Sequence, residues 1–535
     1  MIKKKGNNWL FAAGLTIPVL AFFAGYLFNY NRDYIPTGLI MEDNALYLSY
    51  ARQYADADKL HLFYTNPFND SGNYSPIYFQ TQSILLALMM KTGISAGFLM
   101  IIFVILFSLL CFRLIIEIYV VLVSEGKYRT LGIILFAWGG GLLALSGIPV
   151  HFMRPPDGQD LFDRMFFLDP GWGWWGLNLG RSFFITCEAF YHFLFLLSIL
   201  MVLKKKWKAA LLSIFILSIS HPFTGIELLS ILGAWLFIEK LVVKNKTIPW
   251  YFAIGSGLIM VFHIFYYLYY LNQFPDHKSV SEQFSVNWRL RFFSMIPAYA
   301  IVAPLAFLSI FKFSKPKLFF QNSHNRFFLC WLIVVLLLVN HELFMKPRQP
   351  IHFTRGYDWT GFFLLGLPAI RPIFDYLNKI KRGKLILGIF VCLFLSDNFL
   401  WITNYIRFTD KTKSVMYISP EQKEILGVIK DKGDNKTLFI SSDFDVSLLS
   451  AVYSKAYPWI SNPYTTPFYK EKKESFDNFI TKGKTDSSWA GRKIIFLFNK
   501  KDSLENAAAN RNNSALLLKE TSNYKLFSTD SLINQ

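Results

Sequence analysis

The sequence predicts an α-helical polytopic membrane protein of about 11 transmembrane helices, followed by a small soluble α/β domain. Of its 535 residues, 53% are hydrophobic and only 17% are charged, whereas soluble domains carry about 25% charged residues. Several apolar runs reach the roughly 20 residues that cross a bilayer. The formal charge of +19 lies largely in Lys and Arg clusters between these runs, as orientation in a membrane requires. This distribution argues against nucleic acid as a partner.

The basic clusters also set the predicted topology. Lys3 to Lys5 precede the first apolar run, and no small-residue cleavage site follows it. We therefore expect an uncleaved first helix and a cytoplasmic N-terminus. The hairpin within 209–243 breaks at His221-Pro222, because proline lacks the backbone donor that a helix interior needs. The predicted spans are 9–28, 96–122, 130–149, 182–203, the two arms of 209–243, 250–271, 291–311, 327–345, 357–377 and 385–403.

One apolar segment, residues 78–91, is too short for a span. At about 14 residues it fits a surface-lying or re-entrant helix better. If it crossed the bilayer, every later orientation would flip, and the basic clusters would all lie outside. The predicted topology places four loops outside the cytoplasm, namely 30–95, 150–181, 272–290 and 346–356.

Residues 405–535 differ in composition from the predicted membrane domain, residues 1–404. They are rich in Lys, Asp, Asn and Ser, and they contain no span. Residues 421–429 have the pattern of an amphipathic helix, and residues 437–441 and 493–497 have the pattern of strands. This alternation predicts an extracytoplasmic α/β domain. The four cysteines of the chain lie inside or beside apolar segments and show no disulfide or metal-binding spacing.

Glu42 and Asp43 follow the first predicted span closely. A bare carboxylate in hydrocarbon costs several kcal/mol, so this acidic pair must face water at the membrane surface. A carboxylate in a partly dry site acts as a general base when its pKa is tuned. The structural alternative is a pair of solvated loop acids, or an N-cap for a helix over 44–55.

Basic residues in the last predicted outer loop suit phosphate. Arg348, His352 and Arg355 could hold a lipid-linked phosphate, since guanidinium binds it in bidentate fashion. They could equally anchor the chain among lipid headgroups. Arg355 is favoured because it opens the next span, at the depth of a lipid phosphate.

Aromatic residues in the outer loops could bind sugar rings. Tyr47, Trp174 and Trp175 offer flat faces, although the tryptophans fit an interfacial aromatic belt at least as well. His221 could contact a substrate or simply bond to a neighbouring group at the helix break. A metal is not favoured and no cofactor is expected: Asp157, Asp160 and Asp163 have suggestive spacing, but the glutamate that ends a calcium loop is missing.

Residues 43–47 (Asp-Asn-Ala-Leu-Tyr), followed by Ala51-Arg52, resemble the first outer-loop motif of the GT-C membrane glycosyltransferases. The likeness is to the dolichyl-phosphate-mannose and aminoarabinose transferase branch, whose pattern is Asp-Glu-Ala-Leu-Tyr with Ala-Arg one helical turn on. It implies that Asp43 is the catalytic base. The glutamate of that pattern is Asn44 here, and Glu42 precedes the aspartate instead, so either Asp43 or Glu42 could be the catalytic base.

The resemblance extends to the tail and implies a function. Residues 445–450 and 457–467 resemble the outer C-terminal domain of some members. The implied protein is a hexosyl- or pentosyltransferase in a membrane of the cell envelope, with the bacterial inner membrane as the expected location. It would move a sugar from a polyprenyl-phosphate donor to an extracytoplasmic glycan, lipid or protein. Direct attack by the acceptor implies inversion.

Two other functions are compatible with the sequence. A transporter or flippase for lipid-linked sugars should carry paired broken helices in two related halves, and the sequence shows one clear break, at His221-Pro222. A non-catalytic scaffold would use the outer tail to recruit partners.

Overall fold

The structure is a computed structural model, which describes residues 5–28, 33–57, 61–69, 75–123, 125–153, 161–165, 168, 177–185, 187–313, 316–408, 414–511 and 515–529. The chain forms two compact units. The first contains residues 1–25, 104–265 and 285–408, and the second contains residues 26–103, 266–284 and 409–535. The domain boundary near residue 404 stays a prediction.

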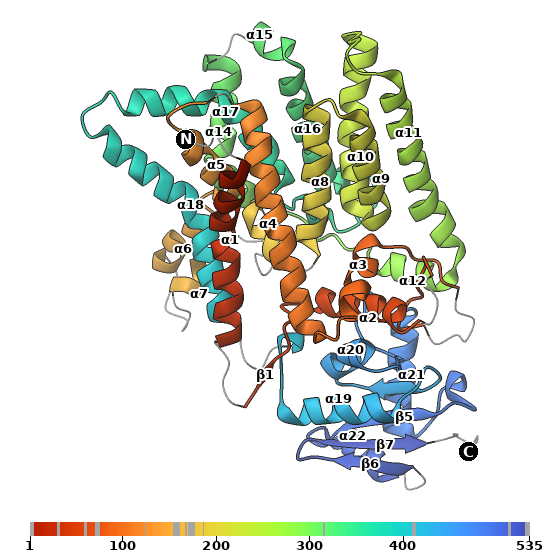
Figure 1. Cartoon of the computed structure of the whole chain (residues 1–535). Helices are drawn as coiled ribbons and strands as arrows, with labels where there is room; N and C mark the ends of the chain where they lie inside the picture. The colour runs from red at the N-terminus through yellow and green to blue at the C-terminus, as the bar shows by residue number, and fades with distance from the viewer. Residues whose placement is uncertain are drawn as a thin grey trace. The chain divides into compact units, whose positions relative to one another are not determined.

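The first unit is helical (Figure 1). Two of its helices, over 96–122 and 357–377, have the predicted bounds. The helices that belong to it wholly or largely are α1 (Lys5–Phe28), α4 (Ala96–Leu122), α5 (Arg129–Trp138), α6 (Gly147–Met153), α7 (Leu161–Met165), α8 (Glu188–Leu203), α9 (Trp207–Ser220), α10 (Pro222–Phe237), α11 (Trp250–Ile264), α13 (Phe292–Tyr299), α14 (Val302–Leu308), α15 (Pro316–Gln321), α16 (Ser323–Val339), α17 (Tyr357–Leu377) and α18 (Gly383–Phe408). Short 3₁₀ turns include Gly180–Phe184 before α8 and Pro350–Phe353 before α17.

Four helices of the described residues are long and apolar enough to cross a membrane: Asn8–Phe28, Ala96–Leu122, Trp250–Gln273 and Gly383–Arg407. Helices α13 and α14 meet at a 70° bend and make a fifth if they are one span. Shorter apolar helices, among them α8, α9 and α16, overlap other predicted spans. The chain is therefore an integral membrane protein, while the number of eleven spans stays a prediction.

One predicted span, 130–149, is not a continuous helix. Helix α5 ends at Trp138, and the backbone is extended at Gly139. A buried polar network satisfies the interrupted backbone: the carboxylate of Asp397 accepts from the backbone N–H of Ala144 at 2.8 Å and from the side chain of Asn178 at 2.8 Å. Asn398 donates to the backbone oxygen of Trp138 at 2.9 Å. The break thus has its own hydrogen-bond partners, as helix ends inside a protein require.

The predicted hairpin over 209–243 is confirmed. Helix α9 ends at Ser220, and α10 begins at Pro222, whose missing N–H costs nothing in the first turn. Helices α8, α9, α10 and α11 pack side by side, as Figure 1 shows.

The second unit combines three separate stretches of chain. Its first stretch supplies α2 (Glu42–Ala55) and α3 (Thr81–Met90), and its second supplies α12 (Pro275–Gln283). At ten residues, α3 is too short to span a bilayer, in agreement with the expectation for 78–91. The tail supplies α19 (Pro420–Lys432), α20 (Phe444–Tyr453), α21 (Tyr469–Lys482) and α22 (Ser503–Arg511).

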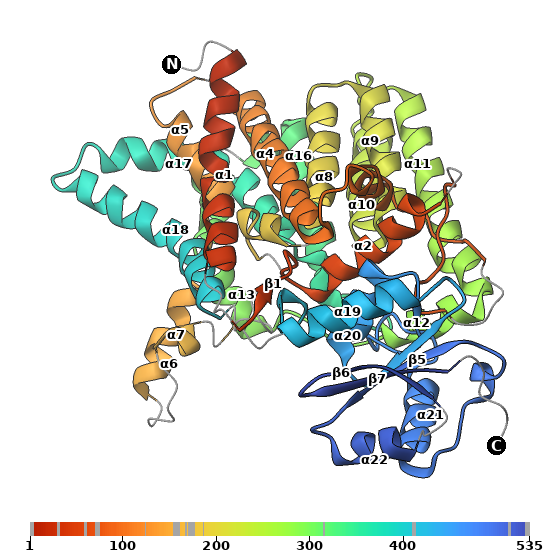
Figure 2. The ribbon, with the colours of Figure 1, turned by 60° about the horizontal axis from the view of Figure 1, so that its bottom comes forward.

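The tail of the second unit folds around a mixed five-stranded sheet of order β4-β3-β5-β7-β6. Helices α19 and α20 lie on one side of the sheet and α21 and α22 on the other (Figure 2). The predicted helix at 421–429 and the strands at 437–441 and 493–497 are confirmed. The strands are β3 (Leu438–Ser441), β4 (Tyr457–Pro458), β5 (Ile494–Asn499), β6 (Leu516–Glu520) and β7 (Tyr524–Thr529), and β1 (Ile35–Pro36) pairs separately with β2 (Tyr417–Ile418).

Helix α2 is fixed within the second unit by two neighbours. It packs against α3 and against α20 of the tail, where the Nε of Arg52 donates to the backbone oxygen of Ala451 at 2.8 Å. Just before α2, Gly38 has a φ of 84° and lies against Gly97. A Cβ at either glycine would collide with backbone atoms, so only glycine permits this close approach.

Candidate functional site

The acidic pair occupies the first turn of α2. The helix begins at Glu42, and its N-cap position is Met41, whose side chain makes no capping bond. Asp43 is therefore inside the helix rather than its cap. Carboxylates in a first turn are stabilised by the unpaired N–H groups and the positive end of the helix dipole. Both side chains are partly exposed, so solvent and ligands can reach them.

The two acids have different surroundings. The Oε2 of Glu42 accepts a hydrogen bond from the Nδ2 of Asn462 at 2.7 Å. Burial and the neighbouring charge of Asp43 raise the pKa of Glu42, and the bond from Asn462 opposes that rise. Asn462 belongs to the tail segment 457–467, so the tail directly contacts the acidic pair. Sequence reasoning noticed this segment but could not pair it with Glu42.

Tyrosines continue from Asp43 along one face of α2. Tyr47 and Tyr50 are one and two turns on, and their rings meet edge to face at 6.0 Å. Burial and the charge of Asp43 raise the pKa of Tyr50, so the carboxylate and this phenol lie close together. Tyr50 then stacks on Tyr64 at 4.6 Å. Tyr47 therefore lies between the acidic pair and a buried aromatic group.

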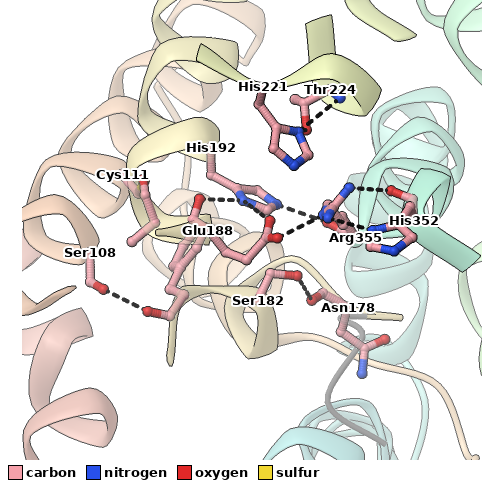
Figure 3. Close-up of polar contacts among 12 residues, drawn as sticks. Ser108, Cys111, Asn178, Ser182, Glu188, His192, His221, Thr224, His352 and Arg355 are labelled. Carbon is pink, nitrogen blue, oxygen red and sulfur yellow. Dashed lines mark hydrogen bonds and ion pairs between the residues drawn. The ribbon is translucent and has the colours of Figure 1, made fainter. Parts of the chain in front are cut away.

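Arg355 is the centre of a buried polar group in the first unit, shown in Figure 3. Arg355 as a whole residue is 2% exposed. Its Nε donates to the Oε1 of Glu188 at 2.8 Å, and its Nη1 donates to the backbone oxygen of His352 at 2.5 Å. The backbone oxygen of Arg355 lies 2.9 Å from the Nε2 of His192. We call Glu188, His192, His352 and Arg355 the Arg355 group.

Hydrogen bonds define the protonation of His352. Its Nδ1 accepts from the Nη2 of Arg355 at 2.8 Å, and its Nε2 faces the side-chain oxygen of Gln349. An arginine only donates, so the ring proton belongs on Nε2 and the imidazole is neutral. Burial, followed by the charge of Arg355, lowers the pKa of His352 accordingly. The ring also stacks on Phe223 at 4.5 Å.

The backbone around Arg355 has unusual geometry. Gln349 has a φ of 44°, Arg355 a φ of 35° and Gly356 a φ of 73°. A non-glycine residue at positive φ costs of order 1–3 kcal/mol and persists only where the surroundings enforce it. Gly356 also approaches the backbone of Leu179 so closely that a Cβ would not fit. The loop is therefore held in the shape that turns Arg355 inward.

The other residues predicted for the site lie in different surroundings. His221 is the N-cap of α10: its Nδ1 accepts from the backbone N–H of Thr224 at 3.1 Å, which fits the helix-break interpretation, and Figure 3 shows its ring beside the Arg355 group. Arg348 is exposed, and its backbone N–H donates to His341 at 3.0 Å. Trp174 and Trp175 lie outside the described residues.

The structure adds residues that the sequence did not single out. Glu188 and His192 looked like ordinary members of an apolar span, and their pairing with Arg355 has no local pattern. Glu227 on α10 is fully buried, and neither of its carboxylate oxygens has a hydrogen-bond partner among the described residues. The sequence had offered Glu227 together with His221 at the helix break, since an acid inside an apolar helix is a candidate for function.

Within the described residues, no group of three or more His, Cys, Asp or Glu side chains could hold a metal ion. Asp157 and Asp160 of the suggestive aspartate spacing lie outside those residues.

The fold of this chain is similar to that of an oligosaccharyltransferase, as two solved structures of that enzyme show. The oligosaccharyltransferase of Archaeoglobus fulgidus in its apo form matches with a TM-score of 0.54 and 9% identity, over 85% of this chain and 65% of that chain. The same enzyme tethered to an acceptor peptide containing an Asn-Val-Thr sequon matches with a TM-score of 0.52 and 10% identity, over 94% and 70%.

A third likeness is weaker. ArnT of Cupriavidus metallidurans, bound to undecaprenyl phosphate, matches with a TM-score of 0.47 and 10% identity, over 96% of this chain and 98% of that chain. No protein-family model matches the sequence, and no curated protein matches it either. At these identities the likeness concerns the fold, and this chain spans less than two thirds of the apo oligosaccharyltransferase.

Proposed function

We propose that this protein is a membrane glycosyltransferase. It transfers a sugar from a polyprenyl-phosphate donor to a glycan, lipid or protein outside the cytoplasm. The observation that carries the proposal is the acidic pair in the first turn of α2, in a chain that has the fold of an oligosaccharyltransferase. That enzyme was also solved with a tethered acceptor peptide, which supports transfer to an acceptor in general.

In the proposed reaction, Asp43 is the general base. The acceptor oxygen attacks the anomeric carbon of the donor, and Asp43 takes the proton of the acceptor hydroxyl. The bond between the anomeric carbon and the phosphate oxygen breaks, and its electron pair leaves with the polyprenyl phosphate. A single displacement of this kind inverts the anomeric centre. Glu42, held by Asn462, supports Asp43 and is the second candidate for the base.

Arg355 is the proposed phosphate ligand, with His352 and Arg348 beside it in sequence. Its guanidinium is oriented by Glu188 and His352 before any ligand binds. A preorganised cation stabilises the negative charge that develops on the leaving phosphate without further rearrangement. Tyr47 and His221 are proposed to contact the sugar or the acceptor.

The decisive experiment compares Asp43→Asn with the wild type. Membranes of cells carrying either version are analysed for glycolipids and glycans, and purified proteins are assayed with polyprenyl-phosphate hexose and pentose donors. We expect transfer by Asp43→Asn to fall by about 10²–10⁴-fold, the usual contribution of a general base. Asp477→Asn, an exposed aspartate on α21, is the matched control and should transfer normally.

Unimpaired transfer by a folded Asp43→Asn protein would remove Asp43 from the mechanism. Loss in Glu42→Gln alone would move the base to Glu42. If no sugar transfer occurs but lipid-linked sugars cross vesicle membranes, the protein is a transporter instead.

A further inference from the structure

A cavity of about 480 Å³ lies at the C-terminal end of α2 in the second unit. Its walls come from three separate parts of that unit: the end of α2, the segment 61–65 and the tail. The residues that matter most for its chemistry are Arg52, Asp56, His61, Phe63, Asn435 and Lys455. We call it the α2 pocket. Its volume is in the usual range for small-ligand sites.

The pocket has an excess of positive charge. Arg52 and Lys455 are basic, and Asp56 is the acid that pairs with Arg52 at 2.9 Å. Lys455 is exposed, and no ion pair joins it to any residue that the structure describes. One cation is thus neutralised inside the pocket and the other is not, so the pocket favours a ligand that carries an acidic group.

Hydrogen-bonding groups of the wall are already oriented. The Nε of Arg52 donates to the backbone oxygen of Ala451 at 2.8 Å. Gln53 holds Thr65 with both ends of its side-chain amide. Its Oε1 accepts from the backbone N–H of Thr65 at 3.1 Å, and its Nε2 donates to the backbone oxygen of Thr65 at 2.9 Å. A wall fixed in this way loses little conformational freedom when a ligand binds.

His61 adds an acceptor to these donors. Its Nδ1 lies 2.7 Å from the backbone oxygen of Phe63. A carbonyl oxygen can only accept, so Nδ1 carries a proton, and in the neutral ring Nε2 keeps a lone pair. The ring stacks on Tyr54 at 4.9 Å. His61 can therefore accept from a hydroxyl group, while Arg52 and Lys455 donate.

The pocket also offers an apolar face. Phe63 is 41% exposed, and an exposed aromatic ring in a polar pocket suits the flat face of a sugar ring. Donors, one acceptor, an aromatic platform and a surplus positive charge together fit a polyhydroxylated ligand that bears a carboxylate.

Helix α2 connects this pocket to the acidic pair. Arg52 and Asp56 lie 9 and 13 residues after Asp43 in the helix region, which corresponds to about 14–20 Å along the axis. The tyrosines on the Asp43 face reach the pocket as well, because Tyr50 stacks on Tyr64, a wall residue. A ligand in the pocket is therefore too far from Asp43 to be the attacking group itself.

We infer that the α2 pocket binds an acidic sugar unit of the acceptor, several units away from the hydroxyl that receives the transferred sugar. This inference names the acceptor as an acidic oligosaccharide, and it rests on the proposed function for the role of that ligand. Binding in the pocket holds the acceptor chain along α2 and presents its end to Asp43.

The test measures binding to the full-length protein in nanodiscs by calorimetry. The probes are tetragalacturonate and its methyl ester, which has the same rings with masked carboxylates. We expect tetragalacturonate to bind at least about tenfold more tightly than the ester, and Lys455→Glu to abolish that preference. Lys430→Glu, an exposed lysine of α19 outside the pocket, is the matched control and should bind like the wild type.

Two further variants separate this inference from the proposed function. Phe63→Ala should weaken both probes, and Asp43→Asn should keep the preference for tetragalacturonate over the ester. Equal binding of the two probes, an equal loss in Lys455→Glu and Lys430→Glu, or displacement by inorganic phosphate at the same concentration would overturn the inference. Retained transfer by Asp43→Asn would overturn the proposed function and leave a Lys455-dependent binding result intact.

Discussion

The acidic pair and the Arg355 group are built in opposite ways. Glu42 and Asp43 are partly exposed in the first turn of a helix, and Glu42 is held by the neutral amide of Asn462. Arg355 is 2% exposed and is fixed by a carboxylate, an imidazole and a strained backbone. A base must exchange a proton with its surroundings, whereas a cation that receives a phosphate is most effective when oriented in advance. The difference matches the two proposed roles.

The largest effect is expected at Glu188, within the Arg355 group. Glu188→Gln leaves Arg355 buried without its negative partner, which should lower the free energy of unfolding by about 3–5 kcal/mol. Thermal unfolding in detergent measures this loss. Glu227→Gln is the control: the carboxylate of Glu227 has no hydrogen-bond partner among the described residues, so its removal should be neutral or stabilising. Equal melting temperatures for the two variants would show that Glu188 and Arg355 do not depend on each other.

A smaller loss is expected at the acidic pair. Asn462→Ala removes a hydrogen bond to Glu42 that is 2.7 Å long, and such a bond to a charged group contributes about 1.5–3 kcal/mol. Asn478→Ala, which affects a partly exposed residue of α21 whose side chain accepts from Lys482 at 3.0 Å, is the control. In the double variant with Glu42→Gln, the effect of Asn462→Ala should shrink. If it stays the same size, Asn462 acts through some other contact.

The N-cap of α19 in the tail should contribute about 1 kcal/mol to the free energy of unfolding. The hydroxyl of Ser419 accepts from the backbone N–H of Gln422 at 3.1 Å, and the side chain of Gln422 accepts from the backbone N–H of Ser419 at 2.9 Å. The two bonds form a capping box. Ser419→Ala should therefore lower the melting temperature of the second unit slightly. Ser522→Ala, an exposed serine without a cap, should not. A loss of several kcal/mol would mean that Ser419 has a second role.

The smallest expected effect is a change in how strongly folding stability depends on pH. Burial raises the pKa of Glu42, so the folded chain binds this proton more tightly than the unfolded chain does. The charged form therefore destabilises the fold at neutral pH, and this penalty disappears as the pH falls through the raised pKa. The stability of the wild type relative to Glu42→Gln should therefore increase as the pH falls from 7.5 to 5. Parallel stability curves would place the Glu42 carboxylate in an ordinary aqueous environment.

Much of the fold was predictable because a local apolar run in the sequence is enough to indicate a membrane helix. Residues 96–122 and 357–377 are mainly apolar segments, and both helices have the predicted bounds. The break at His221-Pro222 follows from the chemistry of proline. The break at Gly139 was missed, because it depends on Asp397 and Asn178, which are far away in the chain.

The site was harder to predict for the same reason. The motif at residues 43–47 identified the acidic pair, and the basic loop identified Arg355. Their partners Asn462 and Glu188 are 420 and 167 positions away. No periodicity or motif connects residues at that separation. Glu188 was also inconspicuous, since it opens an apolar helix and looks like an ordinary helix start.

The contact between Glu42 and Asn462 has a consequence for biogenesis. The two residues are 420 positions apart, and a ribosome adds about 5–20 residues per second. Roughly 20–80 s therefore separate the synthesis of the acid from that of its partner. During this interval the nascent chain has its first helices but not the amide that holds Glu42. The acidic pair reaches its final environment only after the tail has been made, so a prematurely terminated chain could insert into the membrane without acquiring a finished site.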